Sequence, residues 1–324
     1  MYKDKILKLL RSSKAGFISG EELARKCGIS RTMVWKHVKS LERDGFVIQA
    51  VPSQGYRITS VPDILRLGDI KPGLKTRIIG KEIELLPEVA STNTLAMERA
   101  ANGAPEGTVV IAEKQTGGKG RLGRKWISPK GNLYLSLILR PDIPTYKAPL
   151  ITLMGAVAVA SAIKRQCALE TVIKWPNDIL IFGKKVSGLL TEMSAEQDRI
   201  RHIVLGIGVD VNMDLGELSP EVRELTTTLA FAAGEKINRT ALLQEILRDL
   251  DHWYQVFLSN VQDVLSEWNA LNMTIGNRVM VSGGGETLEG VAQGIDNEGR
   301  LIIRLTDGAI RSVAAGDVTI QKNL

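Results

Sequence analysis

The first sixty residues carry three short amphipathic runs separated by turn signals. Residues 3–11 place apolar side chains at helical spacing. Ser19-Gly20-Glu21-Glu22 forms a capping box, with Glu three residues after Ser, and predicts a second helix. Gly28-Ile29-Ser30 predicts a tight turn, and its serine can cap a third helix over residues 31–43. The apolar face of that third helix consists of Val34, Val38 and Leu41.

The outer face of the predicted third helix is largely basic. It carries Arg31, Thr32, Trp35, Lys36 and Lys39. Two strand-like runs follow, 47–51 and 56–58, on either side of a turn at 52–55. Two helices, a tight turn and a two-stranded wing are typical of a winged helix-turn-helix, whose second helix enters the major groove of DNA. Such helix pairs also serve as protein-interaction modules. The distribution of charge distinguishes DNA binding from this alternative.

The distribution of charge favours DNA. Residues 1–60 contain 12 Lys and Arg against 5 Asp and Glu, whereas the other 264 residues contain 30 against 31. The whole basic excess therefore lies in the helix-turn-helix segment, where it suits a polyanion. We predict that Gly20 to Lys39 binds DNA, with lysines on phosphates and with Arg31, Thr32 and Trp35 reading bases.

From about residue 75 the pattern becomes a mixture of strands and helices. Residues 62–72 are typical of a linker with a short helix. Strand-like runs cover 83–86, 108–113, 132–139, 172–175, 179–182, 186–192 and 202–211. Helical runs cover 94–101, 148–166 and 239–260, and four further strand-like runs lie at 278–282, 288–295, 301–305 and 310–313. Strands in bunches, with helices between only some of them, predict an α+β layer rather than a doubly wound sheet.

Composition argues against several classes of protein. No stretch reaches the ~18 uninterrupted apolar residues of a membrane helix, and the start does not lead into a signal-peptide core. Cys27 and Cys167 lie in different predicted domains, so we expect no disulfide and a cytoplasmic location. The three histidines, His37, His202 and His252, are not clustered, so a His/Cys metal centre is not expected.

A glycine-rich segment matches a dinucleotide motif that its context does not support. Residues 118–123 match G-x-G-x-x-G after a strand-like run, but a dinucleotide fold needs a helix to begin there. Residues 124–131 contain Pro129 and Gly131 and cannot start a long helix. Four glycines and four cations within residues 117–125 predict instead a loop that wraps an anion, the alternative being an ordinary surface loop.

Three further polar clusters are weak signals when taken singly. Ser91-Thr92-Asn93 starts a helix, so it is a cap at least. Lys174-Trp175-Pro176-Asn177-Asp178 joins two strands, and Lys184-Lys185-Val186-Ser187-Gly188 opens a hairpin. A lone lysine is usually a solvated surface group, so only the combination of clusters is informative.

In order and spacing, these clusters resemble the motifs of biotin–protein ligases. The series is 91–93, Gln115 with 118–126, 174–178, 185–192 and Gly206-Ile207-Gly208-Val209-Asp210-Val211-Asn212. With the helix-turn-helix in front, the chain resembles over nearly its full length the class that is both ligase and biotin-operon repressor. The resemblance implies a winged helix-turn-helix at 1–62, a catalytic α/β domain with a mixed sheet at 63–271, and an SH3-like barrel at 272–324.

The resemblance also implies a two-step reaction. Biotin and MgATP give biotinyl-5′-AMP and pyrophosphate, and a lysine of a biotin carboxyl carrier protein domain then attacks the acyl carbon. Two anions meet in the first step, so fixed cations are needed to offset their repulsion. Lys185 is our first choice to bridge the biotin carboxylate and the phosphate, with Arg121 and Lys119 on a closing loop and Lys174 nearby.

The remaining site residues divide by ligand, again as the resemblance implies. The set for biotin is Ser91, Thr92, Asn93, Gln115, Lys119, Gly120, Arg121 and Lys185. The set for the nucleotide is Arg121, Arg124, Trp126, Asn177, Asp178 and Asp210. No cluster of protein residues predicts a resident metal, but Mg²⁺ arriving with ATP is expected near Asn177 and Asp178.

Two positions depart from the family's usual pattern. The family loop usually carries Arg where Lys119 stands, and lysine keeps the charge but loses the bidentate fork. The family commonly has Asn where Asp210 stands. An Asn both donates to and accepts from adenine, whereas an ionised Asp only accepts. The first departure affects how firmly the loop closes, and the second affects how tightly adenine is bound.

The resemblance implies partners as well. Biotinyl-5′-AMP is expected as corepressor, with operator DNA as target, a homodimer as the liganded form, and no membrane association. One alternative is a dedicated transcription factor that only senses biotin, which the retained Lys185 and Arg121 disfavour. The other is a lipoate–protein ligase, which the N-terminal DNA module and the C-terminal barrel disfavour.

Overall fold

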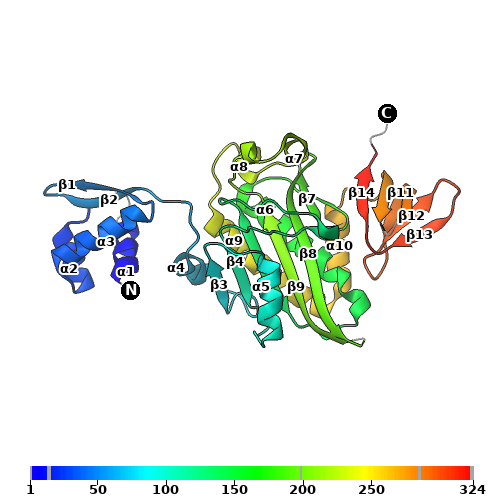
Figure 1. Ribbon diagram of the computed structural model, residues 1–324, viewed down its shortest axis with the longest axis horizontal. Coiled ribbons are helices and arrows are strands. Elements are labelled where there is room, and N and C mark those ends of the chain that lie inside the picture. The colour runs from blue at the N-terminus through cyan, green and yellow to red at the C-terminus, as the bar shows by residue number, and fades with distance from the viewer. Residues whose placement is uncertain (1, 13–15, 198, 284–285, 322–324) are drawn as a thin grey trace. The chain divides into compact units, whose positions relative to one another are not determined.

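The computed structural model describes residues 2–12, 16–197, 199–283 and 286–321 (Figure 1). It divides the chain into two compact units, Met1–Ile64 and Leu65–Leu324. The first unit has a hydrophobic core of its own, and the second holds a large sheet whose core extends into the C-terminal strands.

The first unit consists of three helices and a two-stranded wing. Its elements are α1 (Tyr2–Ser12), α2 (Gly20–Cys27), α3 (Arg31–Arg43), β1 (Val47–Val51) and β2 (Gly55–Ser60). Both predicted caps are present, because the Ser19 side chain accepts from the Glu22 amide and the Ser30 side chain from the Met33 amide. The predicted apolar face of α3 is buried, so the helix-turn-helix and its wing are confirmed.

The wing is joined to the chain between α1 and α2 by one pair of backbone hydrogen bonds. The Ile18 amide donates to the Tyr56 carbonyl at 3.0 Å, and the Tyr56 amide donates to the Ile18 carbonyl at 2.8 Å. The neighbouring Gly55 has a φ of 109°, and a Cβ there would lie 2.0 Å from the Ile18 carbonyl oxygen. Only glycine fits a position that combines this backbone conformation with so close an approach.

The second unit is built on a seven-stranded sheet in the order β3-β4-β5-β9-β8-β7-β6. Its strands are β3 (Ile83–Leu86), β4 (Val109–Ala112), β5 (Leu133–Leu139), β6 (Val172–Lys174), β7 (Asp178–Ile181), β8 (Lys184–Glu196) and β9 (Arg199–Val209). β3 and β4 run parallel, and the other neighbours are antiparallel. The predicted mixed sheet is therefore confirmed.

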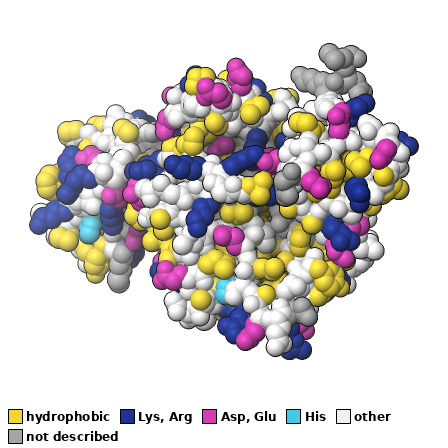
Figure 2. Space-filling model, turned by 45° about the vertical axis from the view of Figure 1, so that its right-hand side comes forward, with side chains coloured by type: hydrophobic (Ala, Val, Ile, Leu, Met, Phe, Trp, Pro, Cys, Tyr) yellow, Lys and Arg dark blue, Asp and Glu magenta, His cyan; other side chains and the backbone are white. Residues whose placement is uncertain are grey.

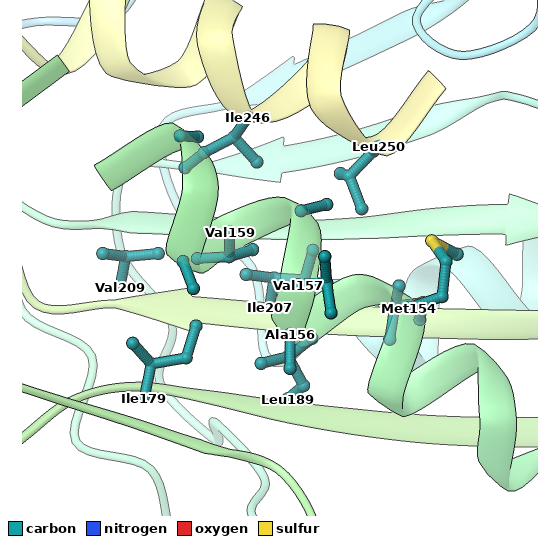
Figure 3. Close-up of a cluster of buried hydrophobic side chains, with 14 of the residues drawn as sticks. Met154, Ala156, Val157, Val159, Ile179, Leu189, Ile207, Val209, Ile246 and Leu250 are labelled. Carbon is teal, nitrogen blue, oxygen red and sulfur yellow. The ribbon is translucent and has the colours of Figure 1, made fainter. Parts of the chain in front are cut away.

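Helices cover both faces of this sheet. α6 (Pro149–Cys167) packs against α9 (Arg239–Ser259) and α10 (Val261–Leu271) on one face, where their apolar side chains meet those of β7, β8 and β9 (Figure 3). α5 (Thr92–Ala101) covers the other face through Ala96 and Ala100, which pack on Val110 and Val204. Because the strands are buried on both faces, β5 is an apolar run without alternation.

One helical segment, Thr145–Cys167, is long and apolar enough by composition to cross a membrane. Within the structure it is a core helix, since 72% of its most apolar window is buried. It contacts α9, α10 and strands of the large sheet. Burial on all sides explains why its sequence lacks a polar face.

The C-terminal strands form a second sheet, of five strands in the order β13-β12-β11-β10-β14. They are β10 (Arg278–Gly283), β11 (Glu286–Ile295), β12 (Leu301–Leu305), β13 (Ile310–Val313) and β14 (Asp317–Ile320). All neighbours are antiparallel. Four of these strands were predicted, but β14 was missed, although with four residues it is no shorter than the predicted β13.

Three helices were also missed by sequence reasoning: α7 (Pro220–Leu225), α8 (Leu229–Ala233) and α10. The first two have six and five residues, too short for a helical period to show. α10 follows α9 with only Asn260 between them, and this residue caps α10 without a Gly or Pro to mark the break. The predicted short helix of the linker is present as α4 (Leu67–Ile70).

Candidate active site

A cavity of about 140 Å³ lies where the start of α5, the glycine-rich loop and the ends of several strands meet. It is lined by Ser91, Thr92, Asn93, Gln115, Lys119, Gly120, Arg121, Arg124, Lys125, Trp126, Asn177, Asp178, Lys185, Gly188, Leu189, Leu190, Gly206, Ile207, Gly208 and Asp317. The structure therefore brings together residues of all five motifs of the series, spread over more than a hundred positions of the chain. One end of the cavity is neutral and polar, and the other is cationic.

The neutral end is a buried network of hydrogen bonds at the N-terminus of α5. The Gln115 side-chain oxygen accepts from the Thr92 amide at 2.8 Å and from the Thr92 hydroxyl at 3.1 Å. Asn93 Nδ2 donates to Glu192 Oε2 at 2.7 Å. The fully buried Ser136 hydroxyl lies 2.8 Å from Thr92 Oγ1 and 2.7 Å from Asn93 Oδ1. Each side chain is held by another, so the neutral end is rigid before any ligand arrives.

Glycines on β8 and β9 form the floor of the cavity. A Cβ at Gly206 would lie 2.0 Å from Asn93 Oδ1, and one at Gly208 would lie 2.7 Å from the Trp126 ring. A Cβ at Gly188 would lie 2.9 Å from the same ring. The G-I-G pattern thus lets the Asn93 side chain and the Trp126 indole lie directly on the strands. The sequence shows these glycines, but only the structure shows what they make room for.

The cationic end carries two charges on different elements. Lys185 Nζ pairs with Asp178 Oδ1 at 2.6 Å and lies 5.0 Å from the centre of the Trp126 ring. Arg121 Nη1 donates to Asn177 Oδ1 at 3.0 Å and to the Gly316 carbonyl at 3.5 Å. Burial lowers the pKa of Arg121 from its ordinary value, an effect that the carboxylates of Asp317 and Asp178 oppose.

The glycine-rich loop is a small hairpin, with no long helix starting in it. The Gly120 amide donates to the Arg124 carbonyl at 2.7 Å, and the Trp126 amide donates to the Gly118 carbonyl at 2.9 Å. Arg124 also forms an ion pair with Asp317 at the start of β14. The prediction that this segment is not a dinucleotide-binding turn agrees with this geometry. Nothing in the sequence pointed to Asp317 as a residue of this cavity.

A second cavity, of about 480 Å³, adjoins the first along Trp126 and Lys185. It is lined by Arg124, Lys125, Trp126, Ile127, Lys174, Asp178, Leu180, Gly183, Lys185, Asp210, Met213, Leu218, Glu221, Val222, Leu225 and Thr226. About half of its lining residues are apolar, with one aromatic and several aliphatic side chains, and the other half are polar or charged. Lys174 and Asp210, the two predicted site residues absent from the first cavity, both line this one.

Asp210 is buried, with only 4% of its surface exposed. Asn132 Nδ2 donates to Asp210 Oδ1 at 3.0 Å. Burial raises the pKa of Asp210 to about 8, against the opposing effect of the Lys185 charge. Near neutral pH the carboxyl is therefore mostly protonated, so it can both donate and accept. The ionised form considered from the sequence alone is not the one that this environment favours.

Trp126 brings an unused hydrogen-bond donor to the two cavities. Its Nε1 is buried, and no acceptor for it is found among the described residues. Buried N–H groups normally have a partner, so this donor is available to a ligand in either cavity. Among the same residues, no group of three or more His, Cys, Asp or Glu is arranged to hold a metal ion.

In the first unit, the five residues predicted to face DNA are all exposed on α3. Trp35 exposes 51% of its surface and Met33 38%, so both side chains can reach a partner of this helix. Lys39 pairs with Glu42 at 2.7 Å on the same helix. Basic side chains are exposed on this unit, at the left of the space-filling view (Figure 2). Arg31 and Lys36 belong to the same exposed face of α3.

Comparison with known families agrees with this order of parts. The model of the biotin/lipoate A/B protein ligase family matches residues 85–210. A helix-turn-helix domain matches residues 3–57, and the biotin protein ligase C-terminal domain matches residues 274–320. The three matches cover the helix-turn-helix, most strands of the large sheet, and the C-terminal sheet.

Individual proteins are similar over nearly the whole chain. The bifunctional ligase/repressor BirA of Bacillus subtilis is 41% identical over 312 residues, which are 95% of this chain and 96% of that protein. The protein of the same name from Escherichia coli is 31% identical over 98% of this chain and 96% of its own length. The structure of the biotin protein ligase of Aquifex aeolicus with biotin and ATP superposes with a TM-score of 0.64 at 28% identity, covering 75% of this chain and 100% of that one.

Proposed function

This chain belongs to the biotin protein ligase family, in the class whose members are also repressors, and we propose that it attaches biotin to a carrier protein and regulates transcription. The observation that carries the enzymatic part is the cavity that joins a rigid neutral end to a pair of cations. Such a cavity suits a ligand with an uncharged polar ring and a carboxylate. The Aquifex aeolicus relative was solved with biotin and ATP.

The neutral end is proposed to hold the ureido ring of biotin. That ring presents two N–H donors and one carbonyl acceptor, and it needs partners that are neutral and fixed. Ser91, Thr92, Asn93 and Gln115 supply donors and acceptors of this kind, and Ser136 holds two of them from below. A site that is hydrogen-bonded before binding loses little entropy when the ligand arrives. Gly120 lines the same cavity with its backbone alone.

The cationic end is proposed to bring two anions together. A biotin carboxylate oxygen attacks the α-phosphorus of ATP, a P–O bond forms, and the bond from that phosphorus to the departing pyrophosphate breaks. Lys185 and Arg121 offset the repulsion between carboxylate and phosphate and the charge that develops in the transition state. Lys119 adds positive charge in the same cavity, and Lys174 adds it in the adjoining one. Arg121 is already partly withdrawn from water, where its field acts more strongly.

The larger cavity is proposed to hold the adenosine and the phosphates. Its apolar side chains suit a purine, against which the Trp126 ring can stack. The neutral carboxyl of Asp210 offers a donor and an acceptor to the edge of adenine, as an Asn would. Arg124 is the cation placed to meet phosphate oxygens from the loop.

Magnesium enters this proposal with ATP, as part of the substrate. Mg²⁺ is usually held by one or two carboxylates together with phosphate oxygens. Asp178 offers a carboxylate and Asn177 an amide oxygen of the kind that mode uses, and an arriving Mg²⁺ would replace the cations that now face them, Lys185 and Arg121. These two residues would hold the ion, which neutralises phosphate charge during adenylate formation.

In the second half-reaction, the amine of a lysine on the carrier domain attacks the acyl carbon of biotinyl-5′-AMP. A C–N bond forms, the C–O bond to AMP breaks, and the amine loses a proton. Closure of the loop at residues 117–125 over the adenylate would exclude water, which otherwise hydrolyses the mixed anhydride. The carrier proposed as partner is the biotin carboxyl carrier domain of acetyl-CoA carboxylase.

The DNA-binding part rests on α3 and its exposed residues. We infer that this helix enters the major groove of an operator, and that biotinyl-5′-AMP acts as corepressor by favouring a homodimer. We further infer domain limits of 1–62, 63–271 and 272–324, an SH3-like closure of the C-terminal sheet, and a cytoplasmic location. The free cysteines, one buried and one half-buried, support the last point.

The direct test incubates the purified chain with ATP, labelled biotin and a biotin carrier domain. Covalent labelling of the carrier that depends on ATP, with release of pyrophosphate, is expected. Labelled lipoate with a lipoyl domain is the matched comparison, because lipoate–protein ligases share the family. Transfer of lipoate without transfer of biotin, or transfer of neither, would contradict the proposal.

A further inference from the structure

A series of buried hydrogen bonds leads away from the nucleotide side of the site, and it begins at Asn132. This residue is fully buried and lies directly before β5. Its Nδ2 donates to Asp210 Oδ1, and its Oδ1 accepts from the amides of Val211 at 2.7 Å and Met213 at 3.3 Å. The Asn132 side chain therefore fixes both the Asp210 carboxyl and the direction of the chain that leaves β9.

The backbone of Asn132 is held in turn by an arginine from a distant helix. Arg239, the first residue of α9, donates from Nη1 to the Asn132 carbonyl at 2.8 Å and to Glu113 Oε2 at 2.9 Å. The side chain of Arg239 is only 1% exposed and that of Glu113 only 12%. An ion pair buried to this degree joins residues that are 126 positions apart in the chain.

Glu113 is fixed at its other oxygen. Its Oε1 accepts from the Leu65 amide at 2.6 Å, while Oε2 faces Arg239. With both oxygens engaged, the carboxylate cannot rotate without breaking a buried contact. Glu113 itself stands at the end of β4, two residues before Gln115 of the neutral end. The pair is therefore anchored on the sheet, on the start of α9 and on the chain at residue 65.

Stability alone is a weak reason for such a pair. Taking two charges out of water costs about as much as their attraction returns, so buried ion pairs add little net stability. What an ion pair of this kind does provide is a fixed geometry, because removing one partner leaves a buried charge uncompensated. Here, the group that the pair holds in a fixed position is Asn132, the residue that contacts Asp210.

We propose that Glu113 and Arg239 are positioning residues for the nucleotide end of the site, acting through Asn132 on Asp210. The inference rests on the proposed function, since it takes Asp210 to face adenine. Neither residue lines the first or the second cavity. Their effect is therefore selective: they set the geometry of the adenine contact and leave the biotin end, held by its own network, unchanged.

The test measures KM for ATP and KM for biotin separately in full-length Glu113→Gln, Arg239→Met and Arg239→Lys. Glu113→Gln keeps the size and the acceptor for Leu65 but removes the charge that holds Arg239. We expect Glu113→Gln and Arg239→Met to raise KM for ATP by about tenfold, as displaced contacts do, with KM for biotin changed by less than about twofold. Arg239→Lys should recover part of the loss.

Asp249→Asn is the matched control for a merely structural effect. Asp249 is a buried carboxylate on the same helix, paired with Arg165 at 2.7 Å, and among the described residues it has no hydrogen bond or ion pair with Asn132, Glu113 or Arg239. It should destabilise the protein without separating the two KM values. Equal rises in both KM values for Glu113→Gln, or the same split in Asp249→Asn, would overturn the positioning role.

Asp210→Ala distinguishes failure of this inference from failure of the proposed nucleotide site. If Asp210→Ala leaves KM for ATP unchanged, adenine does not bind at Asp210 and the proposed site is wrong. If Asp210→Ala raises KM for ATP but Glu113→Gln does not, the nucleotide site stands and the positioning role is wrong. Glu113→Gln is nearly isosteric. If Arg239→Met fails to fold, the two KM values can still be measured in Glu113→Gln.

Discussion

Lys185 Nζ lies 2.6 Å from Asp178 Oδ1 in an ion pair at the edge of the cavity, where the side chains remain 31% and 18% exposed. The carboxylate keeps the ammonium on the cavity side of the hairpin, and Trp126 supports it from the other direction. A cation held in this way, without being sealed from the cavity, is available to a second anion. Lys185 therefore has the geometry for an electrostatic role.

Lys185→Ala should slow formation of the adenylate by ~10²-fold or more, because it removes a fixed cation from the developing charge. Release of pyrophosphate by the folded variant measures this directly. Lys184→Ala is the matched control, since Lys184 is the preceding residue of the hairpin, is exposed, and does not line either ligand cavity. Near-normal release by Lys185→Ala would rule out the role.

The affinity for ATP should depend on pH through Asp210. Burial raises the pKa of this group to about 8, and the opposing charge is Lys185. Below pH 8 the neutral acid donates and accepts, whereas above it the ionised form only accepts. Loss of one hydrogen bond, worth about 1 kcal/mol, predicts a roughly fivefold rise in KM for ATP between pH 7 and 9. Asp210→Asn, measured over the same range, should not show this rise.

The same pKa makes a prediction for stability. A carboxyl with a raised pKa holds its proton in the folded state at pH values where the unfolded state has lost it. Its contribution to the free energy of unfolding is therefore full below about pH 4 and is lost as the pH rises towards 8. The difference in Tm between Asp210→Asn and the unchanged protein should grow in favour of the variant from pH 5 to 8. A constant difference would contradict the raised pKa.

Gly206→Ala should weaken biotin binding more than it weakens ATP binding. The added Cβ would lie 2.0 Å from Asn93 Oδ1, so Asn93 must leave its contacts with Ser136 and Glu192. We expect a loss of stability of about 1–3 kcal/mol, typical of overpacking, and a clear rise in KM for biotin. Gly294→Ala is the control, because a Cβ on that strand glycine meets nothing within 4 Å. Unchanged KM for biotin in Gly206→Ala would show that Asn93 is not needed for binding.

Deleting residues 1–62 should abolish operator binding and leave biotin transfer. The cut falls before Leu65, which is buried and whose amide is bound by Glu113, so the core of the second unit remains complete. Gel-shift and transfer assays on the same preparation measure the two activities. Operator binding by the truncated chain would refute the assignment of α3. Loss of transfer in a folded truncated chain would show that the first unit is needed for catalysis.

Sequence reasoning recovered the residues that carry chemistry, because they occur in short motifs whose order is specific. It predicted Lys185, Arg121 and Gln115, and the structure places all three around one cavity. It missed Ser136 and Asp317, which belong to that cavity or support it, and Asn132 and Arg239, which support Asp210 in the adjoining one. Each of these is an ordinary polar residue in its local sequence, and its partner lies at least forty positions away. Such contacts depend on the order of strands in the sheet, which no local pattern encodes.

The last prediction concerns the effect of ligand binding on the affinity for operator DNA. One winged helix-turn-helix contacts only a short DNA sequence. Specific binding usually needs two such modules, spaced by about 34–36 Å along one face of the duplex. The chain holds one such module, so the second has to come from another copy. The loop at residues 117–125 carries four cations, of which Arg121 contacts Asn177 and Arg124 pairs with Asp317.

Biotinyl-5′-AMP brings an anion to this loop, so binding should close the loop around the ligand. If the closed loop also forms part of a dimer surface, ligand binding favours association of two chains. A ligand shared in this way between two equilibria couples them, typically by about 1–3 kcal/mol. We expect biotin plus ATP to tighten both self-association, measured by sedimentation, and operator binding, measured by titration, by about fivefold or more. Arg121→Ala should lose this response while keeping the basal affinity for DNA, because Arg121 lies in the second unit. Equal dimerisation and equal operator affinity with and without biotin and ATP would mean a ligase whose DNA-binding domain ignores the ligand.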